Sequence, residues 1–230
     1  MAANTEPVKN APVKNEPVKN EPGNTEPDRA EARPVRRGVW GPAARLLLVF
    51  TGLTGLIYPA AVTGLAQVLF PEAANGSLVR VDGVIRGSHL LGQAFEGARW
   101  FWGRPSAVGH DPKVGGASNL GPSNPALHAA VAERVARVRA AHPEHTGPVP
   151  VDLVTTSGSG LDPHLSPAAV RLQVGRVAAA RGLPADRVAA LVEAHTEGRL
   201  LGLWGAPRVN VLALNLALDR LAGPAQAAVP

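Results

Sequence analysis

The sequence has no cysteine among its 230 residues. Disulfide bonds, thiolate nucleophiles and zinc sites that use cysteine are therefore excluded. The phosphate-binding pattern G-x-x-x-x-G-K-[ST] is absent, and no aspartate has a setting that resembles the phosphorylation motif of an ion pump. The chain thus carries no evident catalytic motif of its own.

Seven histidines and one serine-rich loop are the remaining candidates for chemistry. His142 and His145 flank a proline at an expected helix end, which disfavours a metal pair, and the other histidines have no partner at a fixed spacing. Ser157, Asp162 and His164 have the residue types of a hydrolase triad, but one loop is too local for a buried triad. We therefore expect no metal site, no catalytic residue and no enzyme activity in this chain.

Acidic residues are outnumbered, 18 against 23 Lys and Arg, which gives a formal net charge of +5. A nucleic-acid partner is not indicated, because no basic face is interleaved with aromatic residues. Part of the excess is an arginine cluster that precedes the apolar stretch, and its expected partner is the anionic lipid headgroup. The cluster consists of Arg29, Arg33, Arg36, Arg37 and Arg45.

Charge is absent altogether between Arg45 and Glu72. About 20 mostly apolar residues suffice to cross the hydrocarbon core of a bilayer, so we expect one transmembrane helix over residues 42–71. A cleaved signal peptide is disfavoured, because its apolar region is shorter and no A-x-A site follows here. Arginine is denser before the helix than after it, which predicts a cytoplasmic N-terminus in a bacterial inner membrane and an extracytoplasmic domain.

Small residues lie at spacings of three and four inside this span. Gly52, Gly55 and Pro59 share one face of a helix, and such faces let two helices pack closely in lipid. We expect this face to contact a membrane partner. The alternative is a helix that stands alone in lipid, since Gly and Pro are common in membrane helices.

The rest of the chain divides by composition. Residues 1–38 carry repeats of the type EPVKN, whose regular prolines predict a disordered cytoplasmic tail. Residues 72–222 form the expected extracytoplasmic domain, and residues 223–230 a flexible C-terminus. Within the domain, Asp82-Gly83 predicts a hairpin, residues 149–155 alternate like a strand, and residues 108–123 read as a long loop.

Helices are expected mainly in the second half of the domain. Caps at Asn124, Ser166 and Asn210 and a proline at residue 184 predict four of them, and Gly182 is expected to end the second. The predicted fold class is α+β: a single N-terminal transmembrane helix followed by a mixed α/β extracytoplasmic domain.

The motifs of this chain resemble those of the C subunit of the Kdp-type potassium-transporting ATPase of bacteria. The resemblance covers residues 45–221 in one order, with Gly-Leu-Ile-Tyr-Pro at 55–59, Asn-Gly-Ser-Leu at 75–78, Leu-Gly-Gln at 91–93, Phe-Trp-Gly-Arg-Pro-Ser at 101–106, Ser-Asn-Leu at 118–120, Ser-Asn-Pro at 123–125 and Ser-Gly-Ser-Gly-Leu-Asp at 157–162. The proline-repeat tail departs from the short N-terminus of that family.

The resemblance implies a non-catalytic subunit of a potassium uptake complex. Its partners would be a channel-like A subunit, a P-type B subunit that hydrolyses ATP and a small F subunit. The family is also described as a catalytic chaperone that raises the ATP affinity of the B subunit, so ATP is expected only through the complex and no cofactor in this chain. A stand-alone membrane-anchored protein that binds an envelope ligand is the alternative.

Loops that match the family's motifs supply the candidate interface residues. They are expected either to face the channel subunit or to hold the loops together, and they are Gln93, Phe101, Arg104, Ser106, Ser118, Asn119 and Asn124.

Overall fold

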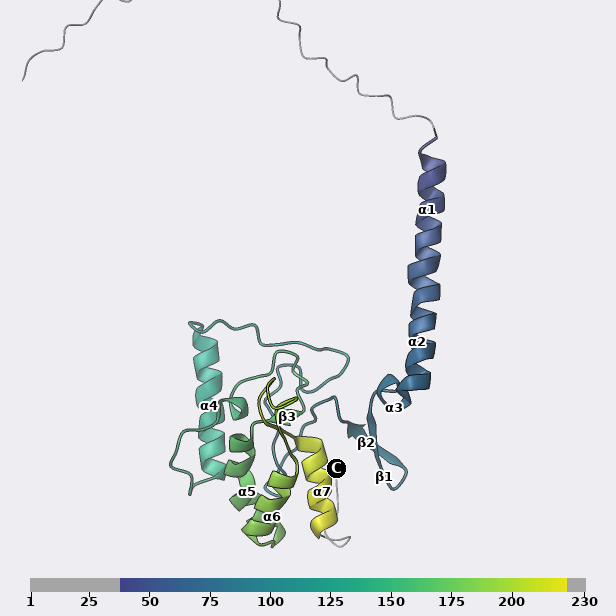
Figure 1. Ribbon diagram of the computed structural model, residues 1–230. Helices are drawn as coiled ribbons and strands as arrows, with labels where there is room; N and C mark the ends of the chain where they lie inside the picture. Colours follow the sequence, from purple (N-terminus) through teal and green to yellow (C-terminus); the bar gives the residue numbers. More distant parts are fainter. Residues whose placement is uncertain (1–37, 223–230) are drawn as a thin grey trace, which may run out of the picture. The chain divides into compact units, whose positions relative to one another are not determined.

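The computed structural model describes residues 38–222 (Figure 1). Within the described residues the chain divides into two compact units, and the boundary lies between Ala60 and Ala61. The predicted tail lies outside the described residues except for Gly38, and so does the predicted C-terminal segment 223–230.

The apolar stretch forms a continuous helical segment from Trp40 to Leu69. It consists of α1 (Trp40–Gly52), a π-helical turn (Leu53–Ile57) and α2 (Tyr58–Leu69). At about 1.5 Å per residue its 30 residues extend about 45 Å, which exceeds the hydrocarbon core of a bilayer. Its most apolar window has a mean hydropathy of 1.8, and none of that window is buried. By length and composition the helix is therefore able to span a membrane.

The π-helical turn has a local cause in the sequence. Proline at position 59 has no N–H for the carbonyl of Gly55 and its ring would clash with that carbonyl. Just before it the helix widens, and the N–H of Tyr58 donates to the carbonyl of Leu53, five residues back. Single π turns of this kind relieve strain inside otherwise regular helices.

A short helix, α3 (Pro71–Ala74), and a hairpin follow the span. The hairpin pairs β1 (Leu78–Val81) with β2 (Val84–Ser88) in antiparallel register. Asp82 and Gly83 both have positive φ, 51° and 78°, as a two-residue turn of this kind requires. The predicted hairpin is therefore confirmed.

Four helices form the second half of the domain: α4 (Pro125–Ala141), α5 (Pro167–Arg181), α6 (Ala185–Ala194) and α7 (Val211–Ala222). Three caps follow the prediction. Asn124 accepts from the N–H of Ala126, Ser166 accepts from the N–H of Ala169, and Asn210 accepts from the N–H of Ala213. Gly182 ends α5 with a φ of 62°, which a residue with a side chain rarely adopts.

A three-stranded antiparallel sheet joins these helices and was not predicted. Its order is β3 (His164–Leu165), β5 (Arg208–Asn210), β4 (Thr196–Glu197). Strands of two or three residues carry no readable alternation, which explains why sequence patterns do not find them.

The strand predicted over residues 149–155 is wrong. This segment instead contains a 3-10 turn, Val151–Leu153, whose geometry buries the neighbouring Leu153 and Val154 together. The carboxylate of Asp152 accepts a 2.6 Å hydrogen bond from the backbone N–H of Ser166 at the start of α5. This bond and the flanking prolines favour the turn over an extended strand.

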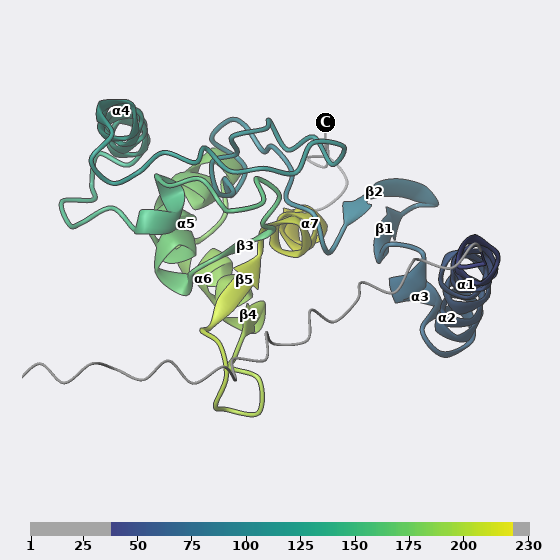
Figure 2. The same cartoon turned by 90° about the horizontal axis from the view of Figure 1, so that it is seen from above.

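The hydrophobic core lies among α5, α6, α7 and the three-stranded sheet, with α5, α6 and α7 adjacent to one another (Figures 1 and 2). Helix α4 contributes less, since Val138 is its only fully buried residue in the described chain. The fold is α+β with one apolar N-terminal helix, as predicted.

Candidate functional site: a basic pocket beside Trp102

Residues 101–106 form an extended segment that two buried amide side chains hold in place. Asn215 on α7 accepts from the N–H of Phe101 at 3.0 Å and donates to its carbonyl at 3.0 Å. Gln173 on α5 does the same for Trp102, at 2.8 and 3.2 Å. Each amide replaces a strand partner, so the segment is fixed without belonging to a sheet.

Arg176 of α5 sits on the Trp102 ring, with its guanidinium carbon 4.1 Å from the ring centroid. Its nitrogens donate to the carbonyls of Gly97, Ala98 and Trp100, to Gln173 and to Nε2 of His142. Burial, together with the charge of Arg137, lowers the pKa of Arg176 to about 10. The guanidinium remains a cation at neutral pH and is solvated by carbonyl groups instead of water.

His142 completes this arrangement as a neutral imidazole. Its Nδ1 lies 2.7 Å from the carbonyl of Val138 and donates to it, while Nε2 accepts from Arg176. The side chain is buried, and this burial, more than the nearby Arg176, lowers the pKa of His142. Protonation would place a second cation against Arg176 and break their hydrogen bond.

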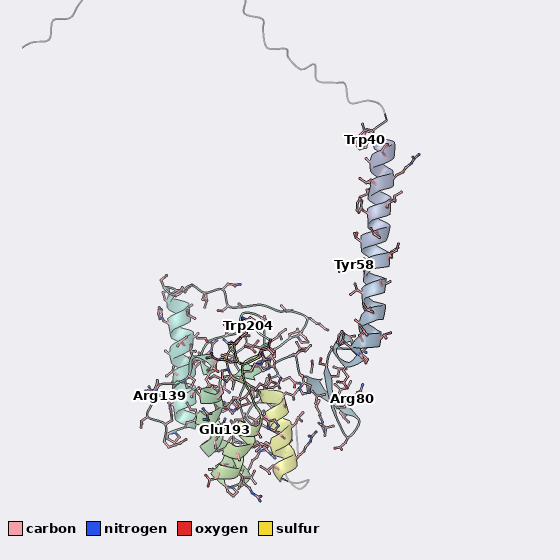
Figure 3. All side chains as sticks on the ribbon, viewed as in Figure 1. Trp40, Tyr58, Arg80, Arg139, Glu193 and Trp204 are labelled. Carbon is pink, nitrogen blue, oxygen red and sulfur yellow. The ribbon has the colours of Figure 1, made fainter. Side chains whose placement is uncertain are left out.

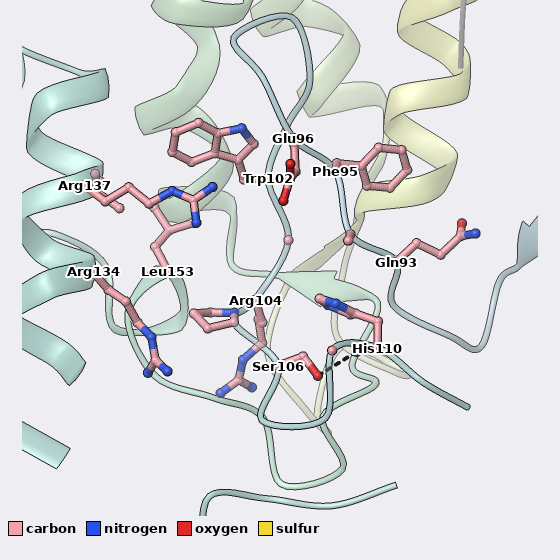
Figure 4. Close-up of a pocket in the computed structure, with 15 residues that line it drawn as sticks. Gln93, Phe95, Glu96, Trp102, Arg104, Ser106, His110, Arg134, Arg137 and Leu153 are labelled. Atoms are coloured by element: carbon pink, nitrogen blue, oxygen red, sulfur yellow. Dashed lines mark hydrogen bonds between the residues drawn. The ribbon is translucent and has the colours of Figure 1, made fainter. Parts of the chain in front are cut away.

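Beside the segment lies a pocket of about 480 Å³, which we call the basic pocket (Figure 4). Helix α4 supplies Arg134 and Arg137, which extend toward the segment that carries Trp102, Arg104 and Ser106. The remaining lining residues come from the loop before the segment, the segment itself, the loop after it, α4 and the 3-10 turn: Gln93, Ala94, Phe95, Glu96, Gly103, Pro105, Gly109, His110, Val138 and Leu153.

The arginines of the basic pocket differ in their partners. Arg104 pairs with Asp162 at 3.0 Å and donates to the carbonyl of Thr156, while its Nε is buried without a hydrogen-bond partner. Arg134 donates only to the carbonyl of Val154, at 3.0 Å, and Arg137 contacts the Trp102 ring at 4.8 Å. Within residues 38–222 neither Arg134 nor Arg137 has a carboxylate within 4.0 Å.

This charge distribution makes the basic pocket complementary to an anion. Glu96 is the one acidic residue among the lining side chains, against three arginines. A concave wall of one charge sign concentrates the field and attracts groups of the opposite sign. Guanidinium groups bind carboxylates and phosphates in a bidentate manner, so either could occupy the pocket.

Ser106 shapes the rim of the basic pocket. Its hydroxyl donates to the carbonyl of Gly160 at 2.7 Å and accepts from the N–H groups of Val108 and His110. His110 is half-buried with a φ of 61°, and burial lowers its pKa. Ser106 therefore fixes the loop that brings His110 to the rim.

The structure brings three of the predicted loop residues together: Gln93, Arg104 and Ser106 all line the basic pocket. Phe101 lies elsewhere, with no exposed surface, in the hydrophobic core. The remaining three do not line the basic pocket: Ser118 accepts a 3.4 Å hydrogen bond from Thr156, Asn119 is exposed at a φ of 53°, and Asn124 caps α4.

The predicted membrane face has open surroundings in the first unit. A Cβ added at Gly52 or Gly55 would meet nothing within 4 Å, and Pro59 is exposed. These positions therefore leave room for the backbone of another helix to approach.

Arg134, Arg137 and the two clamping amides were not among the residues predicted from sequence. The arginines are three apart on a predicted helix, so they lie on one face, and this spacing was the available signal. Gln173 and Asn215 carry no such signal, because a single amide in an apolar helix pattern does not reveal its partner.

Among residues 38–222 no group of three or more His, Asp or Glu could hold a metal ion. The hydroxyl of Ser157 accepts a 3.5 Å hydrogen bond from the N–H of Asp162.

These features define a protein with one apolar helix, suited to a membrane, and an α+β domain with an anion-complementary pocket. The family model of the K+-transporting ATPase c chain, KdpC, matches residues 40–220. The potassium-transporting ATPase KdpC subunit of Sorangium cellulosum is 62% identical over 181 residues, which cover 77% of this chain and 95% of that protein. The KdpC subunits of Methylococcus capsulatus and Herpetosiphon aurantiacus are 57% and 54% identical, covering 78% and 80% of this chain and 96% and 97% of theirs.

The chain therefore belongs to the KdpC family of K+-transporting ATPase subunits. Membership makes it one subunit of a complex, and the apolar helix and the family both fit a membrane location.

Proposed function

We propose that this chain assembles and stabilises the potassium uptake complex without catalysing a reaction itself. Its partners are the channel-like A subunit, the P-type B subunit and the small F subunit. The Gly52, Gly55 and Pro59 face packs against a membrane helix of a partner, and the domain docks on the extracytoplasmic surface of the channel subunit. The arginines before the helix favour a cytoplasmic N-terminus, and the domain after the helix is then extracytoplasmic.

The observation that carries this proposal is the pair Arg134 and Arg137, which point into the basic pocket without a carboxylate partner within residues 38–222. Cations without a carboxylate partner in the described part of the chain favour an acidic segment of the docked subunit as their partner. Charge complementarity of this kind mainly sets the orientation and the rate of docking.

Raised ATP affinity of the B subunit follows, in this proposal, from holding the assembled complex in a nucleotide-competent state. The basic pocket lies in the extracytoplasmic domain, whereas ATP is on the cytoplasmic side, so nucleotide contact is indirect. A reporter enzyme fused to the C-terminus tests the orientation. Activity only outside the cytoplasm supports it, and activity inside reverses the topology.

The test of docking is charge reversal at the basic pocket. We expect the Arg134→Glu, Arg137→Glu double variant to recover at least tenfold less A and B subunit from mild detergent, because attraction becomes like-charge repulsion, which costs several kcal/mol. Arg187→Glu is the matched control, since this arginine is exposed on α6 and lies outside the pocket. Equal recovery with the double variant and the control would refute docking through the basic pocket.

A second candidate is a solitary binder of an anionic envelope ligand, which the same pocket favours. It predicts that the purified chain binds such a ligand with no other subunit present and is recovered alone from membranes. Co-recovery of the ATPase subunits with the wild-type chain would exclude this candidate.

A further inference from the structure

Between β4 and β5 the chain leaves the sheet and forms a loop over residues 198–207 that projects away from the strands (Figure 2). Its large apolar side chains are exposed: 69% for Leu200, 78% for Leu201, 72% for Leu203 and 65% for Trp204. We call these four residues the apolar loop; Trp204 is labelled in Figure 3. Four neighbouring side chains of this size are an unusual patch for a water-exposed surface.

The backbone of the apolar loop is closed on itself. Leu200 and Trp204 form an isolated antiparallel bridge, with N–H groups donating in both directions at 2.9 and 3.1 Å. Gly202 donates to Arg199 and Leu203 donates to Leu200, while Leu201 and Gly202 turn the chain at φ values of 52° and 74°. Backbone groups paired within a segment can enter an apolar medium at low cost.

The charges that border the apolar loop are basic. Residues 198–207 contain Arg199 and no acidic residue. Arg208 follows and pairs with Glu197 at 2.9 Å, which leaves Arg199 as the cation next to the apolar side chains. Within residues 38–222 no carboxylate lies within 4.0 Å of Arg199. A tryptophan among leucines with an arginine beside them is typical of segments at a membrane interface.

A short connection bounds the distance between the end of the apolar helix and the start of the hairpin. The apolar helix ends at Leu69 and β1 begins at Leu78, so residues 70–77 can extend about 30 Å at most. The apolar loop is a projecting tip, and none of its residues lines either of the two described pockets. A deformable lipid surface with anionic headgroups accommodates such a tip, and no groove of matching shape is needed.

We propose that the apolar loop inserts into the headgroup region of the anionic leaflet that the domain faces. The domain then has two attachments to the membrane, the apolar helix and this loop. Arg199 contacts the headgroup phosphates while Leu200, Leu201, Leu203 and Trp204 reach the acyl boundary. This attachment is a property of the chain itself and needs no other subunit.

The chain has no cysteine, so a single introduced one can report on depth without background. We would replace Leu203 with cysteine, attach a spin label and reconstitute the full chain alone in vesicles of phosphatidylethanolamine and phosphatidylglycerol. Replacing an exposed side chain leaves the core intact. Ala190→Cys is the matched control, because Ala190 is exposed on α6.

Accessibility to oxygen and to a water-soluble nickel chelate measures the depth of each label. We expect the Leu203 label to be reached by oxygen and shielded from nickel, about 5–10 Å into the headgroup–acyl boundary. The Ala190 label should remain open to nickel. Equal nickel accessibility at both positions would overturn the proposal. Shielding that arises only when the other ATPase subunits are present would also overturn it, and would assign the apolar loop to a protein contact.

Discussion

The clamp that Asn215 places on Phe101 gives the sharpest test of how the fold supports the basic pocket. We would replace Asn215 with leucine, which has a similar volume and suits the middle of α7. Both bonds between this amide and the Phe101 backbone would be lost, and Phe101 has no exposed surface through which water could replace them.

The magnitude follows from the two groups left without partners. A buried N–H or carbonyl that loses its only partner costs about 1–3 kcal/mol, so the pair should lower the free energy of unfolding by about 2–6 kcal/mol. A domain of this size has a total of about 5–15 kcal/mol. The expected loss is therefore a large fraction of the stability.

Urea unfolding of the full chain in detergent measures this loss. Two of the four tryptophans, Trp100 and Trp102, flank Phe101, so tryptophan fluorescence includes a signal from this segment. Arg171→Ala is the control: its ion pair with Glu193 is more than half exposed, and losing it should cost less than about 1 kcal/mol. A change below 1 kcal/mol for Asn215→Leu would refute the idea that the amide clamp supports the segment.

Three further predictions concern single groups. Burial holds the pKa of His142 below its ordinary value near 6.5, so the unfolded chain takes up the proton first as the pH falls. The free energy of unfolding should therefore fall as the pH drops below about 6.5. Urea midpoints at pH 8 and pH 5 should differ more in the wild type than in His142→Asn. Asp219→Ala strips Arg181 of its buried partner at 2.7 Å and should cost about 3–5 kcal/mol in the same assay, and a loss under 1 kcal/mol would contradict a buried pair. Gly87→Ala would place a methyl group against the Gln93 amide and should displace Gln93 from the basic pocket, which should reduce recovery of partner subunits. Gly83→Asn is the control, because this hairpin turn accepts Asn, and it should leave recovery unchanged.

Local signals account for what the sequence predicted correctly. The Asp82-Gly83 turn, the caps at Asn124 and Ser166 and the αL position of Gly182 depend on a few neighbouring residues, so their patterns can be read directly. The apolar stretch is equally local, since its length and lack of charge suffice to predict a span.

Long-range pairing accounts for what was missed. The segment 101–106 is extended because Gln173 and Asn215, distant in sequence, hold its backbone. The strand predicted at 149–155 fails for the same reason, since Asp152 reaches the start of α5. Part of the pocket is predictable from sequence, since Gln93, Arg104 and Ser106 lie in recognisable motifs. Arg134 and Arg137 lie outside these motifs, on the polar face of a helix whose apolar face gives the stronger pattern.

The most direct test of the central claim is recovery of the wild-type chain with its partners. We would tag the C-terminus, solubilise membranes of potassium-starved cells in mild detergent and identify the co-purified proteins by mass spectrometry. We predict that a P-type ATPase and a multi-span channel protein co-purify in fixed proportion to the tagged chain. Recovery of the chain alone, in a detergent that keeps other membrane complexes intact, would contradict its role as an assembly subunit.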